Sequence, residues 1–250
     1  MEVIKIRPSL ARKGARTVVT VDPKVLKQLE AGNLESANLT EGLAINMQKL
    51  MAAVAPTLPK STIDLELGVV QRMAQAGAAL RAHKINLSEH CSDTVRGWAA
   101  FAVGQDESMT ANARLLAIKP FAADKHFGVR EWAWMAVRAI VVANTPDTIK
   151  SLKPWAWDKD ANIRRFSSEA TRPRGVWAAS IPLLRKEPHH ALPILDALKL
   201  DQDRYVEDSV ANWLNDAAKD QADWVRSLLE EWQKNGASER LIKRASRSLK

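Results

Sequence analysis

A repeated pattern in the middle of the chain is the feature that most constrains its fold. Four segments each contain an aliphatic residue followed by a charged one and then a run of helix-forming residues: SDTVRGWAAFAVG, KHFGVREWAWMAVRAIV, KDANIRRFSSEAT and QDRYVEDSVANWLND. Their aliphatic residues, Val95, Val129, Ile163 and Val206, lie 34, 34 and 43 positions apart. A period of this length is typical of stacked helix–turn–helix units. We therefore predict an all-α fold, an α-solenoid of HEAT-like repeats with a concave basic groove; a non-repetitive helical bundle is the alternative.

The composition supports helices over strands. Of the 250 residues, 46% are hydrophobic and only 10 are glycine, which suits a helical chain with a sizeable core. We expect a single repeat domain over residues 21–250, with repeats best defined from about 92 to 226. Residues 29–56 and 61–83 are expected to be helices that cap the array, and Ser238 is expected to be the N-cap of a basic C-terminal helix. Residues 1–20 form a basic arm, either a disordered tail or a segment that follows a phosphate backbone.

Several classes of protein are excluded by what the sequence lacks. The one cysteine, Cys91, allows no internal disulfide and no cysteine-rich metal site, and the five histidines form no HExxH motif. We therefore expect neither a metal nor another cofactor. No apolar stretch is long enough to span a membrane, and the start of the chain lacks the apolar block of a secretory signal. These observations predict a bacterial-type cytoplasmic protein with no membrane association.

The charge balance points to nucleic acid. The chain has 37 lysine and arginine residues against 29 aspartate and glutamate residues, a net charge of +8. Such an excess suits a partner with phosphates, because binding releases counterions, although a basic protein can also simply be soluble. Tryptophans lie among the charges and could stack on bases, but Trp98, Trp132 and Trp213 stand at positions typical of a helix core.

Three carboxylates fall on one face of the second helices of successive repeats. Counted from the residue after each aliphatic–charged pair, Glu131 is at offset zero, Glu169 at offset four and Asp216 at offset eight. Offsets of four advance a helix by little more than one turn, so we expect these acids to lie diagonally across one surface. Basic residues surround them: Arg130, Arg138, Arg164, Arg165, Arg172, Arg174 and Lys219.

Ordinary ion pairs are the alternative explanation for these acids. Glu131 could pair with Arg138 or Lys125. In the same way Glu169 could pair with Arg165 or Arg172, and Asp216 with Lys219.

The segment RRFSSEATRPRGVW, residues 164–177, combines one of these acids with a helix end. Pro173 should end the helix just beyond Glu169, since proline disfavours helical geometry in the preceding residue. Gly175 then permits a turn that brings Trp177 to the surface.

Three segments resemble the AlkC branch of the AlkC/AlkD-type DNA alkylation repair glycosylases. They are FSSEATRPRGVW, VANWLNDAAKDQADWV and FGVREWAWMAVR, and the resemblance is strongest from about residue 92 to 226. One departure is Glu-Ala-Thr where Glu-Gly-Thr is commoner in that branch. The resemblance implies an all-helical HEAT-like solenoid that binds duplex DNA in its concave groove and removes cationic alkylated bases.

The resemblance also implies roles for individual residues. Glu169, Asp216 and Glu131 correspond to the acidic active-site positions, and Trp177, Arg172 and Arg174 to the DNA-facing loop. We expect Glu169 to be the principal stabiliser of the sugar cation, Asp216 and Glu131 to complete an acidic pocket, and Arg165 and Lys219 to join the DNA contacts.

The expected partner is therefore duplex DNA containing alkylated bases, which would associate the protein with the nucleoid. We expect a monomer with no obligate protein partner. The alternatives are a non-catalytic HEAT-like protein that binds bent or branched DNA, and a HEAT-type scaffold for another protein.

Overall fold

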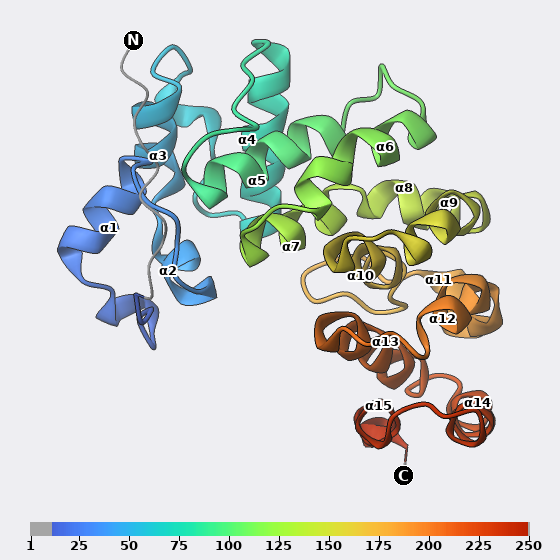
Figure 1. Ribbon diagram of the computed structural model, residues 1–250. Helices are drawn as coiled ribbons and strands as arrows, with labels where there is room; N and C mark the ends of the chain where they lie inside the picture. The colour runs from blue at the N-terminus through green and yellow to red at the C-terminus, as the bar shows by residue number, and fades with distance from the viewer. Residues whose placement is uncertain (1–11, 250) are drawn as a thin grey trace. The chain divides into compact units, whose positions relative to one another are not determined.

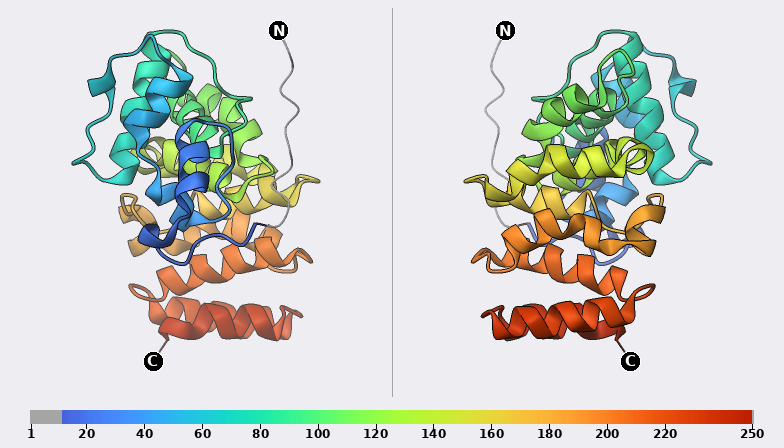
Figure 2. Two further views of the ribbon diagram at one scale, coloured as in Figure 1. Left: turned by 90° about the vertical axis from the view of Figure 1, so that its left-hand side faces the viewer. Right: turned by 90° about the vertical axis from the view of Figure 1, so that its right-hand side faces the viewer.

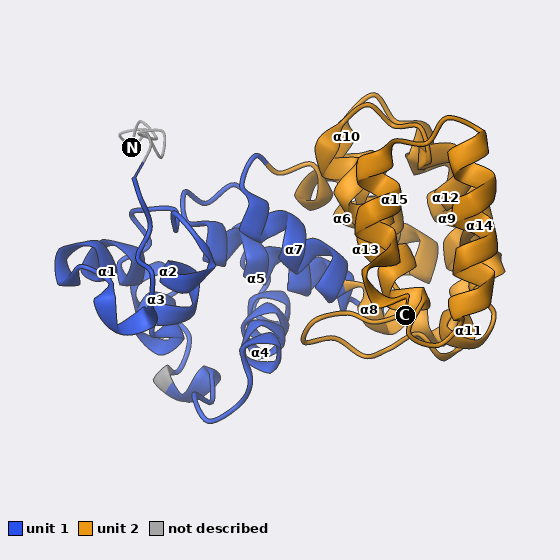
Figure 3. Cartoon of the chain, turned by 90° about the horizontal axis from the view of Figure 1, so that it is seen from below, with its two compact units in different colours: residues 1–108, 125–136 blue, residues 109–124, 137–250 orange. Residues whose placement is uncertain are grey.

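The computed structural model describes residues 12–249, and these residues form helices and no strands. They divide into two compact units, shown in Figure 3, which are described separately. The first contains the described residues up to Ser108 together with Lys125–Ala136, and the second contains Met109–Asp124 and Val137 onwards. The predicted all-α fold class is therefore confirmed, whereas the single repeat domain over residues 21–250 stays a prediction.

In its described residues, the first unit contains six α-helices and two short 3-10 helices. Their bounds are η1 Val18–Thr20, α1 Pro23–Glu30, α2 Leu39–Ala44, α3 Met47–Val54, η2 Lys60–Thr62, α4 Val69–Ala82, α5 Asp93–Gly104 and α7 Phe127–Ala136. Helix α5 packs against both α4 and α7. This close packing depends on Gly97, because a Cβ atom there would lie 2.6 Å from the Trp132 ring and 2.7 Å from the Met73 side chain.

The N-terminal capping helices differ from the sequence-based expectation. Residues 29–56 are interrupted, because α1 ends before Gly32, which has a φ of +75°, and the Asn38 and Asn46 side chains then cap two short helices, α2 and α3. Helix α4 begins only at Val69, several residues later than expected. Asparagine favours the N-cap over the helix interior, which accounts for the two breaks.

The second unit arranges its helices in two columns. Its elements are α6 Ala111–Ala122, α8 Arg138–Ala143, α9 Thr145–Leu152, η3 Lys153–Trp157, α10 Ala161–Glu169, α11 Pro182–Lys186, η4 Pro188–Ala191, α12 Leu192–Leu198, α13 Arg204–Ala217, α14 Ala222–Lys234, α15 Glu239–Ala245 and η5 Ser246–Ser248. Helices α10, α13 and α15 pack in succession in one column, while α9, α12 and α14 form the other (Figures 1 and 3). Figure 2 shows the same stacking of α13 to α15 from two sides.

The sequence repeats coincide with the starts of helices. The anchor residues Val95, Val129, Ile163 and Val206 lie in the first turns of α5, α7, α10 and α13, and all are buried. Trp98, Trp132 and Trp213 are also buried, which confirms their predicted core positions. Ser238 caps α15 by accepting a hydrogen bond from the backbone of Leu241 (3.0 Å), as expected.

Two further expectations concern the ends of the chain and the membrane. Of the basic arm, Lys5 and Arg7 lie outside the described residues, whereas Arg12 forms a two-fold ion pair with Glu41. Within residues 12–249 none of the helices has the length and apolar character needed to span a bilayer.

Candidate active site

The end of α10 positions the first candidate acid, Glu169. The helix is capped by Asp160, whose side chain accepts a hydrogen bond from the backbone of Asn162 (2.8 Å), and its last residue is Glu169. As the sequence predicts, the helix stops shortly before Pro173. The carbonyl oxygen of Pro173 then accepts a hydrogen bond from the backbone of Ile181 (2.9 Å), which closes the loop that follows.

One arginine joins two of the three candidate acids. Arg172 donates from Nη1 to Glu169 Oε1 (2.7 Å), and from Nη2 and Nε to Asp216 Oδ2 (2.6 and 2.9 Å). Glu169 and Asp216 are only 3% and 4% exposed. The fold thus brings together two carboxylates from α10 and α13, with one guanidinium between them.

Glu169 has two further partners. The Ser209 hydroxyl donates to Glu169 Oε2 (2.7 Å), and Arg165 Nη2 lies 3.4 Å from the same oxygen. The Arg165 guanidinium is also 4.3 Å from the centre of the Tyr205 ring, within range of a cation–π interaction. Burial alone would raise the pKa of Glu169, but the two arginines and the hydrogen bonds outweigh it and hold the pKa below its ordinary value. Glu169 is therefore ionised at neutral pH.

Asp216 has a second cation, Lys219, whose ammonium lies 2.9 Å from Asp216 Oδ1. The sequence suggested this pair as well as the pairs of Glu169 with Arg165 and Arg172, and the structure contains all three. Burial acts to lower the pKa of Arg172, but Glu169 and Asp216 raise it above its ordinary value. Arg172 is consequently charged in any condition in which its two acids are.

Arg138 supports the site from α8, a role that the sequence did not assign to it. Its guanidinium donates to the carbonyl oxygens of Ala179 (2.7 Å), Ala170 (3.0 Å) and Arg172 (2.8 Å). Burial, followed by the charge of Arg172, lowers the pKa of Arg138 to about 10, so it remains charged at neutral pH. The sequence does contain a signal for this role, because Arg138 is the one charge in the apolar run AWMAVRAIVV. An arginine buried in such a run needs several hydrogen-bond acceptors.

The loop that Arg138 holds exposes an aromatic side chain. Trp177 is 47% exposed and has a φ of +59°, a backbone region that a tryptophan rarely occupies. A bridge between Gly175 and Ala178 encloses it. Nearby, Asp220 binds both Arg174 Nη2 (2.8 Å) and Arg185 Nη2 (2.9 Å). The loop therefore presents a tryptophan and a cation on an anchored, strained backbone.

The candidate DNA-contacting cations fall into two groups. Arg174 and Lys219 are partly exposed, whereas Arg165 and Arg172 are mostly enclosed by the acids that they bind. The structure therefore brings Glu169, Asp216, Arg165, Arg172 and Lys219 into one cluster in the second unit.

Glu131 belongs to the first unit and is described by its own surroundings. It lies on α7, where the indole nitrogen of Trp134 donates to Glu131 Oε2 (2.8 Å). Its participation in a site with Glu169 and Asp216 stays a prediction.

Potential metal ligands occur elsewhere in the second unit. In the part of the chain that the structure describes, Glu187, His189 and His190 have ligand atoms within 4.8 Å of one another, at η4. The carboxylates of Glu169 and Asp216 are engaged with two arginines, a lysine and a serine. The expected absence of a metal stays a prediction.

The chain was compared with known sequences and solved structures. No family model matches the chain. The uncharacterized protein YhaZ of Bacillus subtilis is 37% identical over 97 residues, which are 39% of this chain and 27% of YhaZ. Among solved structures, the alkylpurine DNA glycosylase AlkC of Pseudomonas fluorescens, bound to DNA containing an abasic site analog, has a TM-score of 0.61 and 24% identity.

Coverage differs between these relatives. The AlkC comparison covers 90% of this chain but 62% of AlkC, so this chain spans less than two thirds of that protein and a smaller part of YhaZ. AlkD2 of Streptococcus mutans has a TM-score of 0.58 and 20% identity, over 73% of this chain and 91% of AlkD2. The likeness predicted from the SEATRPR segment is thus confirmed at the level of structure: the chain has the all-helical, HEAT-like fold of AlkC and AlkD2.

Proposed function

We propose that the protein is a DNA glycosylase of base excision repair, which hydrolyses the N-glycosidic bond of cationic N3-alkylated bases in duplex DNA. N7-alkylated bases are a further candidate substrate. The observation that carries this proposal is the pair of buried carboxylates, Glu169 and Asp216, bridged by Arg172 and followed by the exposed Trp177 loop. The fold shared with AlkC, whose structure contains DNA with an abasic site analog, supports it.

The chemistry suits an ionised carboxylate. An alkylated base that already carries a positive charge leaves readily, so the transition state needs stabilisation of the sugar cation more than protonation of the leaving group. Glu169, held ionised by Arg165, Arg172 and Ser209, supplies the negative charge and orients the attacking water. Asp216 shares Arg172 and adds to the negative potential.

DNA phosphates could exchange partners with these cations. Lys219 is 44% and Arg172 is 17% exposed, so phosphates beside the lesion can compete with the acids for these two side chains. Each such exchange would release a carboxylate oxygen toward the sugar. The bridged pair is thereby a resting state in which no buried negative charge is left uncompensated.

A second candidate function follows from the burial of Glu169. A carboxylate that is 3% exposed and engaged by two arginines and a serine also suits a purely structural ion pair. A non-catalytic protein that binds bent or branched DNA would have such a cluster. It would bind duplex DNA without releasing any base.

Base release separates the two functions. We expect the protein to release 3-methyladenine from methylated duplex DNA in single-turnover reactions, above the rate of spontaneous depurination. A protein that binds the same duplex at low salt but leaves the base in place would contradict the glycosylase proposal and support the non-catalytic alternative.

The rate of base release should change little between pH 7 and pH 5. Because the pKa of Glu169 lies below its ordinary value of 4.5, the carboxylate stays ionised as the pH falls, and we expect similar enzymatic rates at pH 7 and pH 5 after correction for spontaneous release. In Ser209→Ala the pKa of Glu169 should rise, since one hydrogen bond to the charged form is lost, and the acid limb should move to higher pH. A wild-type rate that falls steeply below pH 7 would argue against an ionised Glu169 as the working form.

Trp177→Ala should weaken DNA binding without unfolding the protein. Aromatic stacking on a base is worth roughly 1–3 kcal/mol, so affinity for a duplex with an abasic site should fall at least about fivefold. The exposed Trp157 of η3, replaced in Trp157→Ala, is the matched control. Fluorescence titration measures both variants, and equal losses would show that Trp177 has no special contact.

A further inference from the structure

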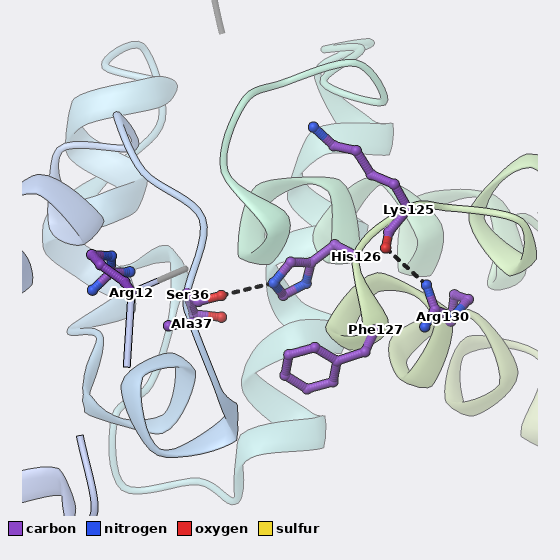
Figure 4. A pocket seen from close by; sticks show the side chains of 7 residues that line it. All are labelled: Arg12, Ser36, Ala37, Lys125, His126, Phe127 and Arg130. Atoms are coloured by element: carbon purple, nitrogen blue, oxygen red, sulfur yellow. Dashed lines mark hydrogen bonds between the residues drawn. The ribbon is translucent and has the colours of Figure 1, made fainter. Parts of the chain in front are cut away.

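A cavity lies within the first unit. It has a volume of about 270 Å³, several times that of a water molecule. Its lining comes from the N-terminal segment and from the start of α7, as Figure 4 shows: Arg12, Ser36, Ala37, Lys125, His126, Phe127 and Arg130.

Buried hydrogen bonds fix the two sides of this cavity to each other. On the N-terminal side, Ser36 donates to Asp93 of α5 from its backbone (2.9 Å) and from its hydroxyl (2.6 Å). On the α7 side, His126 Nδ1 accepts from the backbone of Gly128 (3.1 Å), so its Nε2 carries the proton and donates to the Ser36 carbonyl (2.8 Å; Figure 4). The cavity is therefore preorganised, because its walls are held by groups that are themselves buried.

The acids near the cavity are buried and paired with basic side chains. Glu41 and Glu35 are buried, and they bind Arg12 and Arg96 respectively. Lys125 lies 3.5 Å from Glu35, but its side chain is 61% exposed and so can reach a ligand. An anion entering the cavity would therefore meet the exposed Lys125 ammonium, whereas both carboxylates are buried and paired.

The start of α7 adds to this positive potential. The helix begins at Phe127, and a helix N-terminus carries a partial positive charge. The Arg130 side chain folds back across this end, donating from Nη1 to the Lys125 carbonyl (3.0 Å; Figure 4). Three cationic side chains, from two separate segments, thus line the same open pocket as a helix N-terminus.

We propose that this cavity binds a single phosphate group, and that the group is a backbone phosphate of the DNA. The assignment to DNA rests on the proposed function, while the phosphate chemistry rests on the cavity alone. Arg130 directly precedes Glu131 on α7, so a phosphate held here fixes a strand against the helix that carries this acid. Such a contact fixes the register of the protein on the duplex without recognising any base.

The test neutralises phosphates one at a time. Duplexes containing an abasic-site analogue and one methylphosphonate at successive positions are titrated with wild type, with the double variant Lys125→Gln/Arg130→Gln and with Lys27→Gln, a control at an exposed lysine of α1. For wild type, we expect one position at which neutralisation lowers affinity about tenfold. The double variant should bind the unmodified duplex with an affinity lower by a comparable factor. Neutralising the sensitive phosphate should not lower its affinity further. The slope of its log affinity against log salt concentration should be smaller in magnitude by about 1–2. The control should keep the wild-type profile.

Three outcomes would overturn the proposal. The methylphosphonate profile of the double variant could match that of wild type while thermal unfolding shows both to be folded. Alternatively, inorganic phosphate, followed through the ring resonances of His126, could bind wild type without being displaced by duplex DNA, which would assign the cavity to free phosphate. Absence of any duplex binding at low salt would remove both the DNA assignment and the glycosylase proposal.

Base release by wild type, measured separately, distinguishes the two proposals. Release without a sensitive phosphate position refutes only the cavity assignment. A sensitive position without release refutes only the catalytic proposal and leaves the phosphate contact standing.

Discussion

Glu169→Gln is expected to lower the single-turnover rate of 3-methyladenine release by about 100-fold or more. Positioned acid–base groups typically contribute 10²–10⁴-fold, and glutamine keeps the shape of glutamate while losing its charge. In the variant the amide oxygen can still accept from Arg172, and the amide nitrogen can donate to the Ser209 hydroxyl, so the loop with Trp177 should keep its position. Binding to undamaged duplex should change little, which places the effect on the chemical step.

Asp201→Asn is the matched control for this variant. Asp201 is another enclosed carboxylate bound by an arginine of α10, since Arg164 donates to it from Nε (2.6 Å) and Nη2 (3.0 Å). It lies outside the Glu169–Arg172–Asp216 cluster, so its neutralisation should affect stability but leave base release near the wild-type rate. If Glu169→Gln retains full activity, or if both variants lose activity equally, the catalytic role of Glu169 is wrong.

Arg172→Met should be the most destabilising single change in the site. It removes the guanidinium shared by two buried carboxylates, and breaking a buried ion pair by deleting one partner costs about 3–5 kcal/mol. Arg165 and Lys219 remain, so we expect a loss near the lower end, about 3 kcal/mol in the free energy of unfolding measured with urea at pH 7.

Removing a negative charge should restore part of this loss. In Arg172→Met/Asp216→Asn one of the two uncompensated carboxylates is gone, so the double variant should be more stable than Arg172→Met alone. The difference between wild type and Arg172→Met should also narrow with acid. The lowered pKa of Glu169 gives wild type stability that is present above pH 4.5 and is lost as the pH falls through its folded-state pKa. A cost under about 1 kcal/mol at pH 7, below the usual range for such pairs, would show that Arg172 is not the shared counterion.

The sequence predicted several local features correctly because they depend on short stretches of chain. A buried aliphatic residue in the first turn recurs in α5, α7, α10 and α13, and its period identified the helical repeats. Pro173 ended α10 where expected, and Gly175 preceded a turn that exposes Trp177. By contrast, the continuous helix character expected over residues 29–56 was wrong in detail, because capping by Asn38 and Asn46 outweighed the apolar pattern there.

The sequence by itself determined the helical class, the repeat and the likeness to AlkC. These features depend on the spacing of buried residues and on short motifs, which can be read directly from the order of residues. The tertiary structure decided which charges meet. Only the packing of α10 on α13 sets one guanidinium between Glu169 and Asp216. Likewise, only the course of the chain after α10 brings three carbonyl groups to the Arg138 guanidinium. Partner choice among many similar charges depends on distances of a few ångströms across helices, and burial then strengthens the chosen pairs by excluding water.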